Sequence, residues 1–170
     1  KHDGHSTQVW CEDCVAGIPR HLESGSVDVV VTSPPYNLGT RYGSYDDTVE
    51  RTDYVDWMGK WGAAVHDVLS DEGSVFLNIG GKPSDPWGPF EVLLKLREHF
   101  ELQNVIHWVK SIAIQKEDVG RYPGITGNVS VGHYKPINSP RYVNDCHEYI
   151  FHLTKAGATP LDRLAIGVEY

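Results

Sequence analysis

A run of β-branched residues that ends in two adjacent prolines is the feature that most constrains the fold of this chain. Residues 27–31 are valine at four of five positions, and Thr32, Ser33, Pro34, Pro35 and Tyr36 follow at once. Proline cannot donate the backbone hydrogen bonds of a sheet, so the strand has to end there. The run therefore predicts an interior parallel strand that delivers residues 33–36, here called the tetrad, to an edge of the sheet.

The tetrad combines two hydrogen-bond acceptors with an aromatic ring. Ser33 offers a hydroxyl, Pro34 a carbonyl that no sheet ladder uses, and Tyr36 a flat ring, at the strand end where α/β sheets bind ligands. Acceptors at both N–H bonds of a base amine would favour a pyramidal nitrogen that attacks a methyl sulfonium directly. A base in a duplex would first be flipped out and stacked on the ring. The tetrad thus predicts methyl transfer to a base amine, although two prolines are also an ordinary way to end a strand.

Strand and helix patterns alternate along the rest of the chain. An amphipathic helix is expected to begin at Thr52 and to end at residues 71–73, and a second helix is expected from Pro89 to about His99. The remaining predicted elements are strands over residues 74–79, 102–110 and 146–155. The alternation predicts one α/β domain over residues 1–170, in which 40% of the residues are hydrophobic.

A long glycine-rich loop between the last two predicted strands carries most of the basic residues of the C-terminal half. The candidates for contacts with nucleic acid in this region are Lys110, Lys116, Arg121, Lys135 and Arg141. The net charge of −8 argues against a polyanionic partner, since phosphates are bound by Lys and Arg. The acidic excess is nevertheless confined to residues 1–106, so the loop is expected to meet DNA.

The tetrad resembles motif IV of the β-class DNA amino-methyltransferases, which methylate cytosine N4 or adenine N6 with S-adenosylmethionine. Further segments that resemble this family are Trp10-Cys11-Glu12-Asp13-Cys14, Asn78-Ile79-Gly80-Gly81, Trp108-Val109-Lys110, and Arg141 followed by His147-Glu148. The resemblance implies part of a Rossmann-like methyltransferase sheet, mostly parallel, with helices on both faces. A serine at the first tetrad position favours cytosine N4, and adenine N6 is the alternative.

The resemblance also implies roles for individual residues. Ser33 and the Pro34 carbonyl would accept hydrogen bonds from the target amine, Pro35 would shape the turn, and Tyr36 would stack on the flipped base. Asp13, Thr32 and Ser33 would lie at the cofactor. The role of His147-Glu148 stays open between lining the crevice beside the tetrad and orienting a loop.

Two parts of the family pattern are absent from these 170 residues: the cofactor loop Phe-x-Gly-x-Gly and a target-recognition segment. The expectation is therefore a methyltransferase portion that is inactive alone, with an open sheet edge that invites a homodimer or a complementing second half. A non-catalytic module that binds nucleic acid or dimerises is the alternative from another class.

Cysteine and acidic residues give no metal site in the sequence. Cys11, Cys14 and Cys146 lack a fourth ligand at zinc-finger spacing and are expected to be small buried residues. A solvated acidic face is expected from Asp46, Asp47, Asp53 and Asp56. No apolar run approaches the roughly 20 residues of a membrane span, and no N-terminal leader is visible, so the expected location is the cytoplasm.

Overall fold

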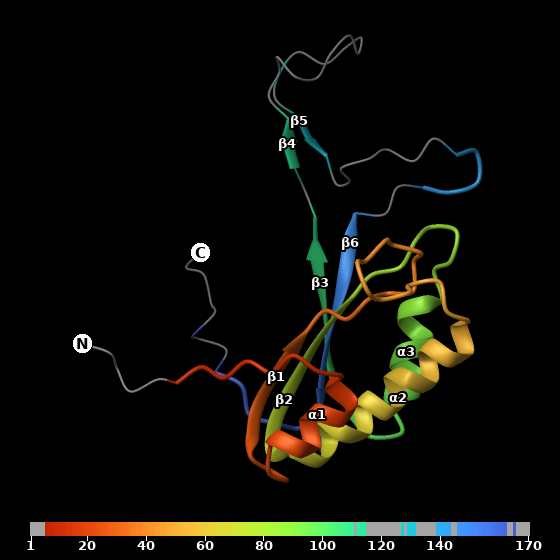
Figure 1. The fold of residues 1–170 in the computed structure, drawn as a ribbon. Coiled ribbons are helices and arrows are strands. Elements are labelled where there is room, and N and C mark those ends of the chain that lie inside the picture. The colour runs from red at the N-terminus through yellow and green to blue at the C-terminus, as the bar shows by residue number, and fades with distance from the viewer. Residues whose placement is uncertain are drawn as a thin grey trace.

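A four-stranded sheet with three helices on one face forms the body of the protein (Figure 1). The computed structural model describes residues 6–110, 112–114, 127, 129–131, 139–143, 146–162 and 165. The helices are α1 (Cys14–His21), α2 (Arg51–Val68) and α3 (Gly88–Leu96). The strands are β1 (Val27–Thr32), β2 (Leu69–Ile79), β3 (Glu101–Val109), β4 (Ile112–Ile114), β5 (Val129–Val131) and β6 (His147–Thr154). The predicted α/β class is confirmed.

Strand direction in the main sheet is mixed. The strand order is β1-β2-β6-β3, in which β1 pairs parallel with β2, while β6 runs antiparallel to both β2 and β3. The pairing is therefore less parallel than the sequence predicted, because β6 inserts between two strands that share a direction. As a consequence, the carboxyl ends of β1, β2 and β3 and the amino end of β6 meet at one edge of the sheet.

Among the described residues the strand before the tetrad lies at the edge of the sheet, whereas the sequence predicted an interior strand. Within the described residues β1 pairs only with β2, and the side chains of Val29 and Val31 are 57% and 76% exposed. A valine run marks a strand but does not say whether a partner lies on each side. In the described part of the chain the outer edges of both β1 and β3 have no strand partner.

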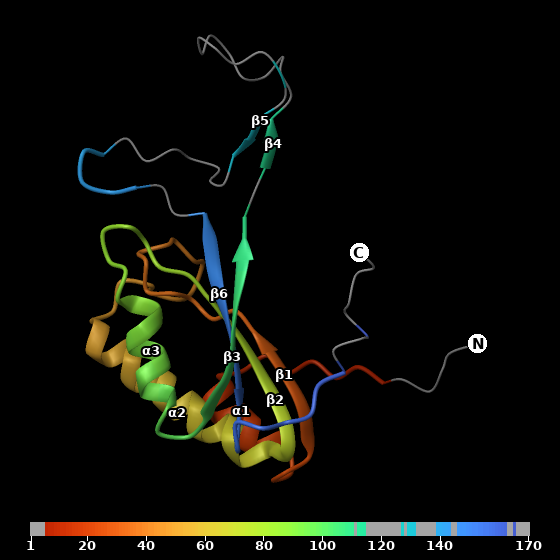
Figure 2. The same cartoon turned by 180° about the vertical axis from the view of Figure 1, so that it is seen from behind.

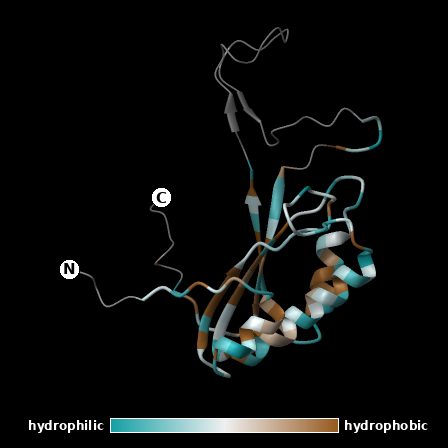
Figure 3. Ribbon diagram, viewed as in Figure 1, coloured by the Kyte–Doolittle hydropathy of each residue, from teal (hydrophilic) through white to brown (hydrophobic). Residues whose placement is uncertain are grey.

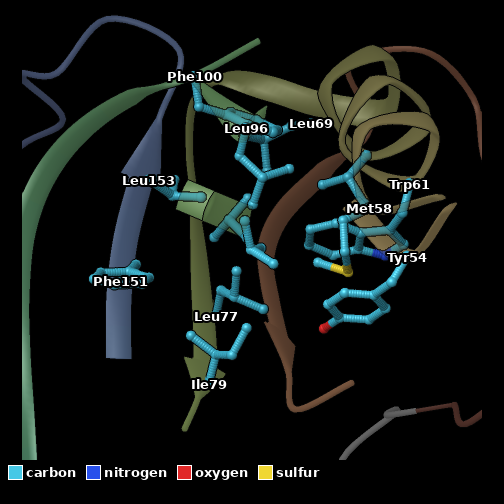
Figure 4. Packing of buried hydrophobic residues seen from close by; sticks show 13 residues of the cluster. Tyr54, Met58, Trp61, Leu69, Leu77, Ile79, Leu96, Phe100, Phe151 and Leu153 are labelled. Carbon is cyan, nitrogen blue, oxygen red and sulfur yellow. The ribbon is translucent and has the colours of Figure 1, made fainter. Parts of the chain in front are cut away.

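The hydrophobic core lies between the sheet and α2 and α3. Figure 4 shows Tyr54, Met58 and Trp61 of α2 pointing toward Leu77 and Ile79 of β2. Hydrophobic residues colour β1 and β2 in Figure 3, whereas α2 alternates between polar and apolar positions, as expected for a helix with one buried face. None of the described helices has the length and apolar character needed to span a bilayer.

Helices cover only one face of the sheet in the described part of the chain. α1 and α3 both pack against α2, and Figure 2 shows the other face of the sheet, on which no described helix lies. The predicted coverage of both faces is therefore not found in these residues.

Two element boundaries differ from those predicted. The expected helix exit at residues 71–73 already belongs to β2, which begins at Leu69 because Val27 of β1 pairs with that residue. The glycine-rich loop after β3 also contains structure, since β4 and β5 form an antiparallel pair of their own. In both places strand pairing decides the backbone conformation against the local turn signals.

A buried histidine ties three strands together at the helix-free face. His152 of β6 is 1% exposed and stacks on Phe76, with the two ring planes 8° apart. Its Nδ1 lies 2.9 Å from Asn104 Nδ2, and its Nε2 lies 3.0 Å from Ser74 Oγ. Asn104 can only donate through Nδ2, so the imidazole is neutral and carries its proton on Nε2. His152 is therefore a packed, hydrogen-bonded residue of the sheet.

Burial lowers the pKa of His152 below its ordinary value of 6.5. The stabilisation by neutral His152 is complete above about pH 6.5 and is lost as the pH falls through the lower pKa of the folded state. We expect the free energy of unfolding in urea to be smaller at pH 5.5 than at pH 7.5, and this difference to shrink in His152→Gln. An equal pH dependence in both proteins would contradict the assignment.

Candidate active site

Strand pairing brings the tetrad next to residues that lie far away in the sequence. Thr32 pairs with Leu77, so that Ser33 follows at the same level as Asn78 of β2. Trp108 of β3 pairs with Glu148 of β6, which brings Glu148 and Lys110 to the same sheet edge. The edge thus collects side chains from four segments of the chain.

These side chains form a connected hydrogen-bond cluster. Ser33 Oγ and Tyr36 Oη lie 2.7 Å apart, and Asn78 Nδ2 donates to Tyr36 Oη at 2.7 Å and to Glu148 Oε2 at 2.9 Å. The Tyr36 hydroxyl also donates to Glu148 Oε2 at 3.4 Å. Lys110 Nζ forms an ion pair with Glu148 Oε1. We call Ser33, Tyr36, Asn78, Glu148 and Lys110 the edge cluster.

One carbonyl of the tetrad backbone is hydrogen-bonded to helix α2, and the carbonyl before it is not. Tyr54 of α2 donates its hydroxyl to the Pro35 carbonyl at 2.7 Å, and burial raises the pKa of Tyr54 so that it remains a donor. The Pro34 carbonyl accepts no hydrogen bond within the described residues, and Ser33 is exposed. The acceptors proposed for the target amine are therefore free of sheet pairing.

Tyr36 is half-buried at the centre of the edge cluster. Burial raises the pKa of its hydroxyl, the hydrogen bond with Ser33 lowers that pKa, and the negative charge of Glu148 raises it again. Because the net direction is upward, the hydroxyl stays protonated at neutral pH. Tyr36 is therefore a hydrogen-bond donor in the cluster.

Gly80 follows β2 and leaves the space that the Tyr36 ring occupies. A Cβ atom at this position would lie 3.1 Å from Glu148 Cγ and 3.2 Å from Tyr36 Cε2, closer than ordinary contacts. A side chain here would therefore push Tyr36 or Glu148 out of place.

We expect Gly80→Ala to lower the free energy of unfolding by about 1–3 kcal/mol, the usual range for overpacking. The matched control is Gly43→Ala, because a Cβ at Gly43 meets nothing within 4 Å. Urea unfolding of both variants measures the difference. Equal stability of the two variants would show that the tetrad can move away without cost.

The loop after the tetrad is organised by the buried carboxylate of Asp47, which was predicted to be solvated. The other members of the predicted acidic face, Asp46, Asp53 and Asp56, are exposed as expected. Asp47 is 1% exposed, and its two oxygens accept the backbone N–H groups of Asn37, Leu38 and Thr40 at 2.9–3.0 Å. Asn37 itself has a left-handed backbone with φ of 58°, a conformation that asparagine adopts more readily than most residues. Asp46, in contrast, is exposed. Its Oδ1 accepts hydrogen bonds from the hydroxyl and the backbone N–H of Thr48, and these bonds lower the pKa of the Asp46 carboxyl.

The residues predicted at the cofactor lie at two element ends. Asp13 is exposed and caps α1, since its Oδ1 accepts from Ala16 N at 3.1 Å, while Thr32 is the last residue of β1. The neighbouring Cys11 and Cys14 are exposed, so the prediction that they are buried is wrong. Although Cys14 is exposed as a residue, partial desolvation of its thiol and the charge of Asp13 raise the pKa of that thiol.

The predicted DNA-binding residues are only partly described by the structure. Lys110 lies with Nζ 5.2 Å from the centre of the Trp108 ring and is engaged by Glu148, whereas Arg141 is exposed. Lys116, Arg121 and Lys135 lie outside the described residues. Lys110 keeps 48% of its side chain exposed despite its ion pair, so Lys110 and Arg141 both stay described candidates for a phosphate contact.

Asn78 was not singled out as a site residue from the sequence, and the role of Glu148 was left open. Each stands at a strand end beside the tetrad, and a polar residue at that position is the signal that could have revealed Asn78. Glu148 begins an antiparallel strand, so its position at the same edge follows only from the direction of β6. The open question on His147-Glu148 is thereby resolved for Glu148, which joins the tetrad.

Comparison with known proteins gives the chain a family. A family model described as DNA methylase, of the N6/N4 type, matches residues 27–170. Type II methyltransferase M.MjaVI of Methanocaldococcus jannaschii is 41% identical over 58 residues, 34% of this chain and 30% of that protein. DNA adenine methyltransferase YhdJ of Escherichia coli K12 is 25% identical over 89 residues, 52% of this chain and 29% of that protein.

A solved structure agrees with these matches at the level of the fold. PvuII DNA methyltransferase, described as cytosine-N4-specific, superposes with a TM-score of 0.58 at 20% identity, over 87% of this chain and 49% of that chain. The matched region is less than half of each of these three proteins. Because the family model covers most of the sequence, the chain belongs to the N6/N4 DNA methylases, the β-class DNA amino-methyltransferases that its tetrad resembles.

Proposed function

We propose that the protein transfers a methyl group from S-adenosylmethionine to the exocyclic N4 of cytosine in DNA at a specific sequence. The observation that carries the proposal is the edge cluster, in which an exposed Ser33 and an unclaimed Pro34 carbonyl stand beside the ring of Tyr36. These groups match what a flipped base with an amino group needs: two acceptors for its N–H bonds and an aromatic surface. Pro35 holds the turn through the bond from Tyr54.

The residues proposed to hold the cofactor are Asp13, Thr32 and Ser33. Asp13 uses one carboxylate oxygen as a helix cap and leaves the other exposed, which fits an acceptor for the hydroxyl groups of a nucleoside. S-adenosylmethionine, when bound, supplies the electrophilic methyl group. The protein residues position the target amine toward this methyl group and accept hydrogen bonds from the N–H groups of the amine.

Adenine N6 is the second candidate target. The same two acceptors and ring suit either amino group, and one relative of the chain is named as an adenine methyltransferase. The serine at the first tetrad position is the sequence feature that favours cytosine.

The test is methylation of DNA by the full-length protein with S-adenosylmethionine, followed by mass spectrometry of the nucleosides. N4-methylcytosine supports the proposal, whereas N6-methyladenine replaces it by the second candidate. DNA binding without any methylated nucleoside would instead support a non-catalytic binding module. Size-exclusion chromatography of the 170-residue chain tests the homodimer proposed from the open sheet edge.

A further inference from the structure

Glu148 is the common acceptor of three side chains from three different elements. Its Oε1 pairs with Lys110 after β3, and its Oε2 accepts from Asn78 of β2 and from Tyr36 of the tetrad. The Glu148 side chain is only 16% exposed, so its charge is largely shielded from water. A carboxylate in this position can only accept, and it therefore imposes directions on the donors around it.

The amide of Asn78 is the first group whose direction is fixed. An ionised Glu148 would repel the Asn78 oxygen, so Nδ2 has to face both Glu148 Oε2 and Tyr36 Oη. Nδ2 also lies 3.3 Å from Ser33 Oγ, but the two shorter bonds use its two hydrogens. The Tyr36 oxygen consequently accepts from Asn78 and keeps its own hydrogen for another acceptor.

Two acceptors compete for the hydrogen of Tyr36, namely Glu148 Oε2 at 3.4 Å and Ser33 Oγ at 2.7 Å. If Tyr36 donated to Ser33, the hydrogen of the exposed Ser33 would have to turn to solvent, and Glu148 would face tyrosine lone pairs. If Tyr36 donates to Glu148, Ser33 donates to Tyr36 and every hydroxyl hydrogen has a partner. The second arrangement gives both hydroxyl hydrogens an acceptor inside the edge cluster, while Asn78 Oδ1 stays buried without a hydrogen-bond partner among the described residues.

This arrangement determines what Ser33 offers to a substrate. With its hydrogen directed at Tyr36, the exposed Ser33 oxygen turns its lone pairs outward. An outward lone pair accepts a hydrogen bond from an N–H group of the amine, whereas an outward hydroxyl hydrogen would face the amine hydrogens and prevent this hydrogen bond. Glu148 thus influences the substrate indirectly, because it orients the hydroxyl group of Tyr36, which in turn orients that of Ser33.

We infer that Glu148 is a positioning residue for methyl transfer: its carboxylate orients the chain Ser33–Tyr36–Glu148 so that Ser33 presents acceptors to the target amine. This inference rests on the proposed function, because it assigns a role within the same site. It extends that function to a residue of β6 that does not touch the substrate.

The rate test uses Tyr36→Phe, which keeps the aromatic ring and removes the hydroxyl, together with Glu148→Gln and the double variant. In single-turnover methyl transfer by the full-length protein we expect each single change to lower the rate by about 10-fold, the loss of about one hydrogen bond. The double variant should also lose about 10-fold and not about 100-fold, because both changes break the same chain. The KM for DNA should change by less than about twofold.

Matched controls separate this role from general damage. Glu98→Gln removes a glutamate that pairs with Lys95 at 3.0 Å, and Tyr42→Phe removes the hydroxyl of an exposed tyrosine. Both controls should keep the rate of the unmodified protein. Single variants within twofold of that rate, or a double variant with multiplied losses, would overturn the inference while leaving the proposed function intact.

A second double-mutant cycle, measured on protein stability, does not depend on enzymatic activity. The free energies of unfolding of the same three variants in urea report whether Tyr36 and Glu148 are coupled in the folded protein. We expect non-additive losses, and additive losses would overturn the inference. If the unmodified full-length protein methylates no DNA, the proposed function fails and the role of Glu148 in it fails too, whatever coupling the stability cycle finds.

Discussion

Tyr36→Ala is expected to lower the rate of methyl transfer by about 100-fold, the upper part of the range for removing one aromatic platform from a stacked base. The substitution removes the ring proposed to hold the flipped base and also the hydroxyl that connects Ser33 with Glu148. It should therefore cost more than Tyr36→Phe, which removes only the hydroxyl. Single-turnover methylation of a DNA substrate measures both effects.

Tyr42→Ala is the matched control for this prediction. Tyr42 lies in the loop that follows the tetrad, is 48% exposed, and makes an edge-on ring contact with Tyr45. Its loss should leave the rate within about threefold, as is usual for surface substitutions away from a site. If Tyr36→Ala were as active as Tyr42→Ala, the stacking role of Tyr36 would be wrong.

Asp47→Asn is expected to destabilise the fold by about 2–4 kcal/mol, because a buried charged acceptor of three backbone N–H groups is replaced by a partly donating amide. Asp47 Oδ2 accepts from both Leu38 and Thr40, so an asparagine NH2 at that place would face two donors. The alternative orientation places the NH2 against Asn37 N, so no rotation of the amide satisfies the loop. Urea unfolding at neutral pH measures the loss.

The neighbouring carboxylate provides the control. Asp46 has the same chemistry one residue earlier, but it is exposed and bonds only to Thr48. Asp46→Asn should therefore have the smaller effect of the two on the urea midpoint. Equal midpoints for both variants would show that the buried carboxylate does not organise the loop.

The elements were predictable because their signals are local. The valine run with its terminal prolines fixes the end of β1. The apolar positions of α2 repeat at helical spacing, and Met58 and Trp61 lie on its buried face. The tetrad could be singled out for the same reason, since its residue types carry their chemistry on four consecutive positions. Turn signals at residues 71–73 failed, because pairing with β1 extends β2 through them.

The environment of single charges was not predictable. Asp46 and Asp47 are adjacent and chemically identical, yet one is exposed and the other lies under three backbone N–H groups. Lys110 belonged to a basic loop in the sequence, but in the fold it pairs with Glu148. Both outcomes depend on contacts between segments, which residue types alone do not encode.

The sequence by itself determined the α/β class, the position of the tetrad at a strand end and the family of this chain. Only the tertiary structure decided which residues stand beside the tetrad, because β6 runs against its neighbours and brings its first residues to the edge where β1, β2 and β3 end. Glu148 is 112 residues from Tyr36 along the chain, and their contact follows from strand order and direction. Local patterns specify secondary structure, whereas the active-site edge arises from long-range pairing.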